Sequence, residues 1–367
     1  MEIVCDGLDL SNAILIVSRA TTTKTPNEIL EGIKIKAIDN TLELSATDSE
    51  LSIVTTIKAE VFKEGEVVIP GNFFGNYLKR LTNEQIKLTQ FENKLRVSYS
   101  DSEGFIQGYD VNEFPKIQEV SDSQSFEIKQ ILFKQLINKT AFAVATDDSR
   151  PILKGVYFEI NNNYINAVAL DGYRMAVVKK EIVNANLNKP IIVPQKTLRE
   201  ITNLLQDNED TVKVNISDNF LSVNINGVTI VSRLLEGQFA DYKNIIPTEF
   251  NTHCIINKEQ FEATLERVSL IARFDKNNIV KFDMKENNIL ITSAGDIGNI
   301  KENLTVNLSG NDLVIAFNSR YFADILKVTQ EEFIQIELNT SFSPCIVKPI
   351  EGDEYIYLIL PVRITNY

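Results

Sequence analysis

The sequence predicts an α+β protein built from three consecutive copies of one domain. Three stretches resemble one another: GIKIKAIDNTLELSATDSEL (32–51), GVYFEINNNYINAVALDGYRM (155–175) and NIVKFDMKENNILITSAGDIG (278–298). Each begins with alternating apolar and polar residues, which is typical of a strand with one buried face. Each then passes through an Asn-containing turn into a second strand that ends at an Asp. The repeat therefore spans about 120 residues, as the positions of these residues indicate: Asp48, Asp171 and Asp296.

Amphipathic helices flank the strand pairs in every copy. We expect two helices in each copy, at 11–19 and 72–81, at 129–145 and 195–205, and at 258–273 and 319–328. This repeat is too long for a solenoid, so each copy should be a domain of its own. We therefore expect domains at 1–122, 123–247 and 248–367.

Composition narrows the class of protein. The chain has 367 residues, a formal net charge of −13, three Cys and a single His. No apolar run approaches the roughly 20 residues of a membrane span, and the N-terminus lacks a basic leader region, so we expect a cytoplasmic protein. The Cys residues are far apart, which favours reduced thiols over a disulfide or metal framework. We expect no metal, no cofactor and a structural role for His253.

Catalytic motifs are missing from the sequence. It contains no Walker A motif, no GxGxxG after a strand, no HExxH and no GxSxG. Positive charge, by contrast, gathers in the predicted helices, which hold thirteen Lys and Arg but five Asp and Glu in an acidic chain. One explanation is that charged side chains merely coat exposed helix faces. The other is a basic surface that binds a phosphate backbone without reading bases.

The turn in VALDGYRMAVV (168–178) differs from its counterparts. Asp-Gly between two apolar runs predicts a β-hairpin. Since all three copies carry the Asp, we expect it to bond the turn backbone. The next residues, Gly172 to Met175, are replaced by SELS and IGNI in the other copies. They are candidates for function, and the alternative is a solvated turn whose Arg does nothing.

Four stretches resemble the bacterial DNA polymerase III beta subunit family, the sliding clamps: RPILKGVYFE (150–159), ALDGYRMAVV (169–178), RLLEGQFADYKNIIP (233–247) and YLILPVRI (357–364). The resemblance covers essentially the whole chain. It implies three tandem DNA-clamp domains that form half of a closed six-domain ring, with two chains joined head to tail around duplex DNA. It also implies a non-catalytic processivity factor. The implied partners are duplex DNA of any sequence, the DNA polymerase III alpha subunit, an ATP-driven clamp loader, other polymerases, ligase, mismatch-repair proteins and a second copy of the chain.

The resemblance further implies a pocket for short peptides of partner proteins. By position, the second copy would contribute Leu153, Leu170, Gly172, Tyr173, Arg174, Met175 and Ile245. The third copy would contribute Asn318, Tyr321, Cys345, Leu358, Leu360, Pro361, Val362 and Arg363. We expect an adaptable apolar floor from Met175, Leu360 and Val362. Tyr173 would stand at the entrance, and Arg174 and Arg363 would hold peptide carbonyls or the aromatic rim.

Basic side chains of the ring would face DNA without base contacts. The candidates are Arg19, Lys24, Lys79, Arg80, Lys134, Lys139, Arg150, Lys196 and Arg199. The chains would join through edge strands near 105–109 and 300–306, since pairing hides the free backbone groups of an edge.

The chain departs from the family pattern in ways that can alter partner preference. Tyr173 stands where some members have His, Leu170 where Thr is usual, and Ala240 where Pro is usual. Thr365-Asn366-Tyr367 extend past the usual end of the family.

Two other functions remain open on the sequence. One is a nucleic-acid-modifying enzyme with a basic cleft, against which the missing motifs weigh. The other is an interaction scaffold that never meets DNA, against which the basic helices weigh.

Overall fold

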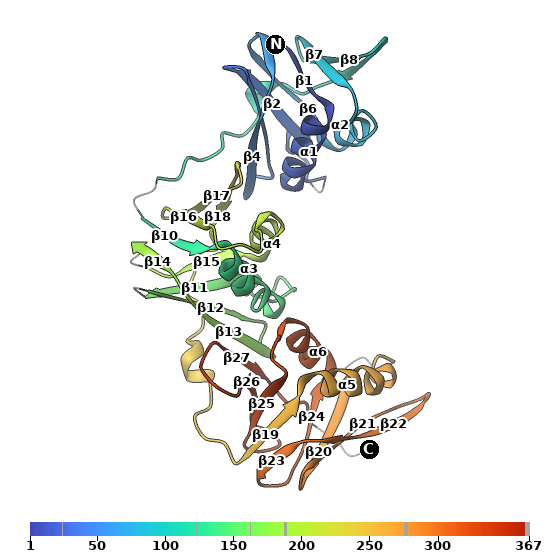
Figure 1. Ribbon diagram of the computed structural model, residues 1–367, viewed down its shortest axis with the longest axis vertical. Helices are drawn as coiled ribbons and strands as arrows, with labels where there is room; N and C mark the ends of the chain where they lie inside the picture. The colour runs from blue at the N-terminus through green and yellow to red at the C-terminus, as the bar shows by residue number, and fades with distance from the viewer. Residues whose placement is uncertain (24, 122–123, 162, 187–188, 275–277, 364–367) are drawn as a thin grey trace. The chain divides into compact units, whose positions relative to one another are not determined.

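The computed structural model describes residues 1–23, 25–121, 124–161, 163–186, 189–274 and 278–363 (Figure 1). Lys24 and the Thr365-Asn366-Tyr367 extension, both named above, lie outside these residues. The chain forms two compact units, Met1–Lys129 with Arg199–Leu234 and Gln130–Leu198 with Leu235–Tyr367.

The element order repeats three times, as predicted. The first copy contains β1 (Glu2–Asp6), α1 (Gly7–Val17), η1 (Ser18–Ala20), η2 (Glu28–Glu31), β2 (Gly32–Ile38), β3 (Thr41–Thr47), β4 (Leu51–Lys58), β5 (Glu60–Lys63), β6 (Gly65–Pro70), α2 (Gly71–Leu78), β7 (Gln85–Phe91), β8 (Lys94–Tyr99), β9 (Ser102–Gln107) and η3 (Val111–Glu113). The second contains β10 (Gln124–Lys129), α3 (Gln130–Asn138), η4 (Ala141–Ala143), η5 (Pro151–Lys154), β11 (Gly155–Asn161), β12 (Tyr164–Leu170), β13 (Arg174–Glu181), β14 (Val183–Asn186), β15 (Ile191–Pro194), α4 (Gln195–Leu204), β16 (Thr211–Ile216), β17 (Phe220–Ile225), β18 (Val228–Arg233) and η6 (Tyr242–Ile245). The third contains β19 (Thr252–Asn257), α5 (Lys258–Ala272), β20 (Ile279–Lys285), β21 (Asn288–Gly295), β22 (Gly298–Thr305), β23 (Asn307–Gly310), β24 (Leu313–Asn318), α6 (Ser319–Val328), β25 (Phe333–Leu338), β26 (Cys345–Pro349) and β27 (Tyr355–Ile359).

Each copy holds two antiparallel meanders of three strands. The first meander is β2–β4, β11–β13 or β20–β22, and the second is β7–β9, β16–β18 or β25–β27. Their strands alternate as predicted: in β20, the side chains of Val280, Phe282 and Met284 are buried and those between them are not. The buried faces form the cores.

Strand pairing explains why the division into units passes through the second copy. In one unit, β18 pairs with β4 within the strand order β10-β16-β17-β18-β4-β3-β2-β6. In the other unit, β13 pairs with β27 within the order β15-β11-β12-β13-β27-β26-β25-β19-β23. The second meander of one copy thus extends the first meander of the copy before it.

The ends of two helices differ from prediction. Helix α1 begins at Gly7, earlier than expected, because the Asp6 carboxylate accepts hydrogen bonds from the N–H groups of Leu8 and Asp9 at 2.9 and 3.0 Å. Helix α3 ends at Asn138, well before the predicted residue 145. There the Thr140 hydroxyl donates to the Leu136 carbonyl at 2.7 Å, and the Thr140 backbone leaves the helical conformation.

The predicted excess of positive charge on the helices is wrong as stated. Within their observed bounds, the six α-helices of the described residues carry seven Lys and Arg and six Asp and Glu. Much of the excess lies just behind helix C-termini, at Arg19, Lys79, Arg80, Lys139 and Arg273. Cations there face the negative ends of the helix dipoles, so part of their role is structural. None of the helices in the described ranges is long and apolar enough to cross a membrane.

Candidate functional site

The DGYRM stretch forms the predicted hairpin turn. Strands β12 and β13 pair up to Leu170 opposite Met175. The Asp171 carboxylate accepts hydrogen bonds from the backbone N–H groups of Tyr173 and Arg174 at 2.8 and 3.0 Å. Gly172 has a φ of +94°, which side-chain-bearing residues rarely adopt. Asp171 therefore stabilises the turn and leaves the following side chains for other contacts.

The same turn role is found in one other copy. The Asp48 carboxylate accepts from the N–H groups of Glu50 and Leu51 at 3.0 and 2.7 Å. In the third copy, Gly295 pairs with Gly298 across a shorter turn. There the carboxylate of Asp296 makes no such bond to any described residue, so the prediction fails for this copy.

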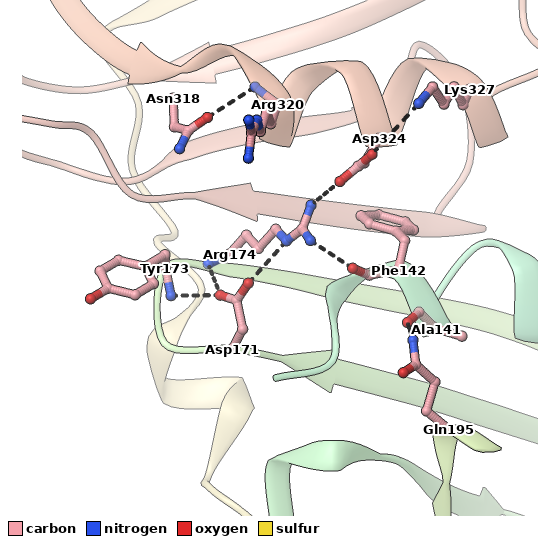
Figure 2. A network of polar contacts seen from close by, with 10 residues as sticks. All are labelled: Ala141, Phe142, Asp171, Tyr173, Arg174, Gln195, Asn318, Arg320, Asp324 and Lys327. Carbon is pink, nitrogen blue, oxygen red and sulfur yellow. Dashed lines mark hydrogen bonds and ion pairs between the residues drawn. The ribbon is translucent and has the colours of Figure 1, made fainter. Parts of the chain in front are cut away.

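Arg174 is held inside the protein by three polar contacts (Figure 2). Its Nε contacts Asp171 Oδ2 at 3.0 Å, its Nη1 contacts Asp324 Oδ2 at 2.6 Å, and its Nη2 donates to the Phe142 carbonyl at 2.7 Å. Its guanidinium also lies 5.4 and 4.8 Å from the ring centroids of Phe142 and Tyr321. The side chain is only 13% exposed.

These contacts give Arg174 a task other than the predicted one. Rather than reaching outward to peptide carbonyls, its guanidinium ties the turn of the second copy to helix α6 of the third, which carries Asp324. The alternative of an idle, solvated Arg is also excluded.

A small apolar cavity lies beside this turn. It has a volume of about 80 Å³ and is lined by Leu170, Gly172, Tyr173, Arg174, Met175, Ile245, Leu358 and Leu360. Met175 and Leu358 face each other across the β13–β27 pair, and both are buried. Tyr173, in contrast, is 63% exposed at the rim. The Leu360 N–H donates to the Tyr173 carbonyl at 2.8 Å, which fixes the segment after β27 against the turn.

The remaining predicted pocket residues lie elsewhere. Leu153 lines a second cavity of about 260 Å³ together with Ala145, Asp147, Ser149, Arg150, Asp171, Gly172 and Tyr173. Tyr321 covers Arg174, Asn318 caps helix α6, and the Val362 N–H bonds the Ala316 carbonyl of β24 at 2.8 Å. The lining of neither cavity includes Asn318, Tyr321, Cys345, Pro361, Val362 or Arg363.

Cys345 is a correction to the prediction, because it is fully buried in β26 and cannot touch a ligand there. Burial raises the pKa of its thiol. The sequence reading missed Ala145, Asp147 and Ser149 at the second cavity. The polar run TDDSRP before Leu153 was the available signal, since such a run forms a surface turn.

Most candidates for DNA contact are accessible to solvent. Arg19 pairs with Glu200 at 3.6 Å, and Arg199 contacts the same carboxylate at 3.3 Å. Of the others, Lys79, Arg80 and Arg150 are exposed, and Lys134 and Lys196 are half-buried.

Lys139 is the exception among these candidates. It is 5% exposed and pairs with Glu331 and Glu354 at 3.8 and 3.2 Å, with its ammonium 5.0 Å from the Tyr355 ring centroid. Burial opposes ionisation of Glu354, but Lys180 and Lys139 outweigh it and lower the pKa of that carboxyl. Lys139 therefore pairs with two half-buried carboxylates and is not available to phosphates, contrary to the prediction.

The His and Cys residues pack against other side chains of the protein. His253 lies 3.3 Å from Glu337 and packs against Phe250. All three Cys are free and buried, and burial raises the pKa of Cys5 and of Cys254 to about 12. In the described part of the chain, no three His, Cys, Asp or Glu side chains are placed to hold a metal ion.

Comparison with known proteins gives one consistent result. Family models of the DNA polymerase III beta subunit match in order, the N-terminal domain at 1–118, the central domain at 127–241 and the C-terminal domain at 243–363. The beta sliding clamp of Staphylococcus epidermidis is 32% identical over 356 residues, which cover 94% of each chain. The crystal structure of a DNA polymerase sliding clamp from Bacillus subtilis is 28% identical and matches with a TM-score of 0.96 over 100% of both chains. The beta subunit from Thermotoga maritima is 29% identical, with a TM-score of 0.91 over 99% of this chain and 100% of that one.

We predict that Arg174→Met lowers stability by about 2 kcal/mol or more, because it leaves the poorly exposed Asp171 carboxylate without its cation and Asp324 with Lys327 alone, at 4.0 Å. Arg320→Met on the same helix is the matched control, since the Arg320 side chain is exposed and should change stability by less than about 0.5 kcal/mol. Urea unfolding followed by circular dichroism measures both. If the two variants unfolded alike, Arg174 would not be the tie described here.

Proposed function

The chain belongs to the DNA polymerase III beta subunit family, and on that premise we propose that it is a DNA sliding clamp. It encircles duplex DNA as a non-catalytic processivity factor and holds the replicative polymerase on its template. The observation that carries this proposal is the uninterrupted match of three family domains along the chain, at 1–118, 127–241 and 243–363. The proposed domain limits are 1–122, 123–247 and 248–367.

Strand pairing between copies supports a closed dimer. The first meander of copy one joins the second meander of copy two through β4 and β18, and copies two and three are joined in the same way through β13 and β27. Among the described residues, the last strand of copy three's first meander, β22, lies at the edge of its sheet. The last strand of copy one's second meander, β9, also lies at the edge of its sheet. A third junction of the same kind would pair β22 of one chain with β9 of a second chain. Two chains would then close a ring of six domains.

The edge strand of the first copy, β9, ends slightly before the predicted range of 105–109 does. Strand β9 ends at Gln107, and the Tyr109 N–H bonds the Val68 carbonyl at 2.8 Å, so Tyr109 is already paired within the chain. Phe105 on β9 is 62% exposed, as expected for a side chain that a partner covers.

The DNA contacts we propose are electrostatic and sequence-independent. The candidates Arg19, Lys79, Arg80, Lys134, Arg150, Lys196 and Arg199 supply positive charge in an acidic chain. Lys139 is no longer among them. Contacts of this kind position phosphates and carry no sequence information, which permits sliding.

The cavity of about 80 Å³ beside Tyr173 is the proposed docking point for partner peptides. Its buried floor suits Leu and Phe side chains, which can carry most of the binding energy of a short peptide. We extend the proposal to the DNA polymerase III alpha subunit, a clamp loader, other polymerases, ligase and mismatch-repair proteins as partners, and to the cytoplasm as the location.

We predict topological retention on DNA. Labelled chain placed on a nicked circular plasmid by a bacterial clamp loader with ATP should stay with the plasmid during gel filtration in salt that screens phosphate contacts, because a closed ring needs no attraction to remain. Cutting the plasmid once should release the chain. Release from the intact circle by salt, or retention on the cut plasmid, would contradict the ring.

Phe105→Asp supplies the control for this experiment. A charge on the β9 edge should weaken the dimer, seen as a lower mass in light scattering, and should remove retention. Weak binding to short linear DNA at low salt should be unchanged.

We predict that Met175→Ala and Leu360→Ala each weaken the binding of a labelled polymerase-tail peptide by about 1–3 kcal/mol, since each removes apolar contact from the floor of the cavity. Fluorescence anisotropy measures the affinity. Met284→Ala is the matched control, because Met284 is buried in β20 and lines neither cavity. It should cost stability and leave the affinity unchanged. If both pocket variants bound the peptide with wild-type affinity, the peptide site would not be this cavity.

A further inference from the structure

We propose that Asn226 is a site of spontaneous covalent modification, at which the side-chain amide is lost and the turn between β17 and β18 becomes isoaspartate. The modification needs no partner, so it is independent of the proposed function. Its effect falls on the junction between copies one and two.

Asn226 and Gly227 form the two-residue turn of this hairpin. Asn-Gly occurs once in the sequence. Strands β17 and β18 pair up to Ile225 opposite Val228, and the φ angles of Asn226 and Gly227 are +53° and +81°. Positive φ at both positions marks a type I′ turn, for which Asn-Gly is a favoured sequence. The turn that suits the hairpin is therefore also the pair of residues in which an amide is most easily attacked by the backbone.

The reaction needs only water and the backbone. The Gly227 nitrogen, once its proton has gone to hydroxide, attacks Cγ of Asn226 and closes a five-membered succinimide. The bond from Cγ to Nδ2 breaks, and ammonia leaves with a proton from water. Water then opens the ring at either carbonyl, which gives Asp or isoaspartate, whose main chain runs through Cγ. Because glycine has no side chain, the attacking nitrogen is unshielded.

Little in the protein protects this turn. Both residues are exposed, and apart from its chain neighbours nothing lies within 4 Å of where a Cβ on Gly227 would be. The Gly227 N–H donates to no backbone carbonyl in the described ranges. The Asn226 Nδ2 lies 3.4 Å from the Leu204 carbonyl, and the Thr55 hydroxyl lies 3.5 Å from the Gly227 carbonyl. Both contacts are long, so the turn can open locally and bring the nitrogen to Cγ while the strands stay paired.

Two Asp-Gly pairs can form the same ring by losing water, but both are held in place. The Gly7 N–H donates to the Glu84 carbonyl at 2.9 Å, and the Asp6 carboxylate caps helix α1. Both oxygens of the Asp171 carboxylate accept hydrogen bonds, from the backbone of its own turn and from Arg174. We therefore expect the Asn-Gly turn to react first.

The product disturbs the contact between copies one and two. The Asn226 amide faces the carbonyl of Leu204, the last residue of helix α4, where the negative end of the helix dipole lies. A carboxylate there replaces a donor with a negative charge. Isoaspartate also lengthens the main chain of a two-residue turn whose length sets the register of β17 against β18. Since β18 pairs with β4 from Val228 opposite Thr55 onward, the altered turn lies at the end of that pairing.

Ageing of the full-length chain tests the proposal. Wild type is incubated at alkaline and at mildly acidic pH, then digested with trypsin, and a sample taken before incubation shows what the digestion itself produces. Mass spectrometry follows the peptide of residues 214–233, which contains Asn215, Asn219, Asn224 and Asn226. A methyltransferase that labels isoaspartyl carboxylates detects the rearranged product. A synthetic peptide of the same sequence gives the rate without the fold.

We expect Asn226 to lose its amide in the folded chain, faster at alkaline pH and more slowly than in the synthetic peptide, while the other three Asn stay intact. Isoaspartate should be the main product. Aged wild type should unfold at a temperature lower by about 2–4 °C, the shift expected for a modest local cost in a large domain. Asn226→Gln keeps an amide without the reactive spacing, so incubation should not change its unfolding temperature.

Two further variants separate charge from chain length. Asn226→Asp introduces the charge without lengthening the main chain, and it should lower the unfolding temperature by less than ageing does. Asn224→Asp is the matched control, because the Thr229 hydroxyl, now 2.9 Å from the Asn224 amide nitrogen, can donate to the new carboxylate. It should unfold like fresh wild type.

If Asn226 stayed intact in the folded chain while the synthetic peptide reacted, the turn would be protective and the inference would be overturned. Earlier modification of Asp6, Asp171 or another Asn would overturn it as well. An unchanged unfolding temperature after ageing, or an equal loss in incubated Asn226→Gln, would contradict the effect on the junction.

Discussion

The pairing of β13 with β27 is the constraint on which the candidate site depends. It runs from Arg174 opposite Ile359 to Val178 opposite Tyr355, and it places Met175 against Leu358. The bond from the Leu360 N–H to the Tyr173 carbonyl continues the pairing past the strand end. Each wall of the apolar cavity therefore comes from a different copy of the repeat, and Arg174 fastens the two copies together beside it.

The fold makes this kind of junction more than once, and the side chains distinguish one of them from the other. Between the first two copies, β18 pairs with β4, and the Arg233 N–H bonds the Glu50 carbonyl at 2.8 Å in the way that Leu360 bonds Tyr173. The backbone is thus alike at both junctions. The turn after Asp48 reaches a positive φ at Ser49, as the second turn does at Gly172, but only the second turn carries an exposed Tyr and an Arg with a 13% exposed side chain.

Local patterns explain how much could be predicted. Alternation, turn residues and the repeat are properties of neighbouring residues, so the sequence predicts the strands, the hairpin at Asp171 and the three copies. The contacts of Arg174 with Asp324 and of Lys139 with Glu354 join residues of different copies, and no local pattern records them. The same limit applies to the cavity at Arg150, where separate loops meet. The sequence alone therefore does not distinguish a basic residue whose charge is free from one whose charge is already neutralised.

A crystal structure of the chain with a bound Leu-Phe peptide would test the central claim most directly. The account predicts that the apolar anchors lie against Met175, Leu358 and Leu360, next to Tyr173, while Arg174 keeps its contact with Asp324. A peptide bound away from the β13–β27 junction, or an Arg174 that leaves Asp324 to bind the peptide, would contradict it.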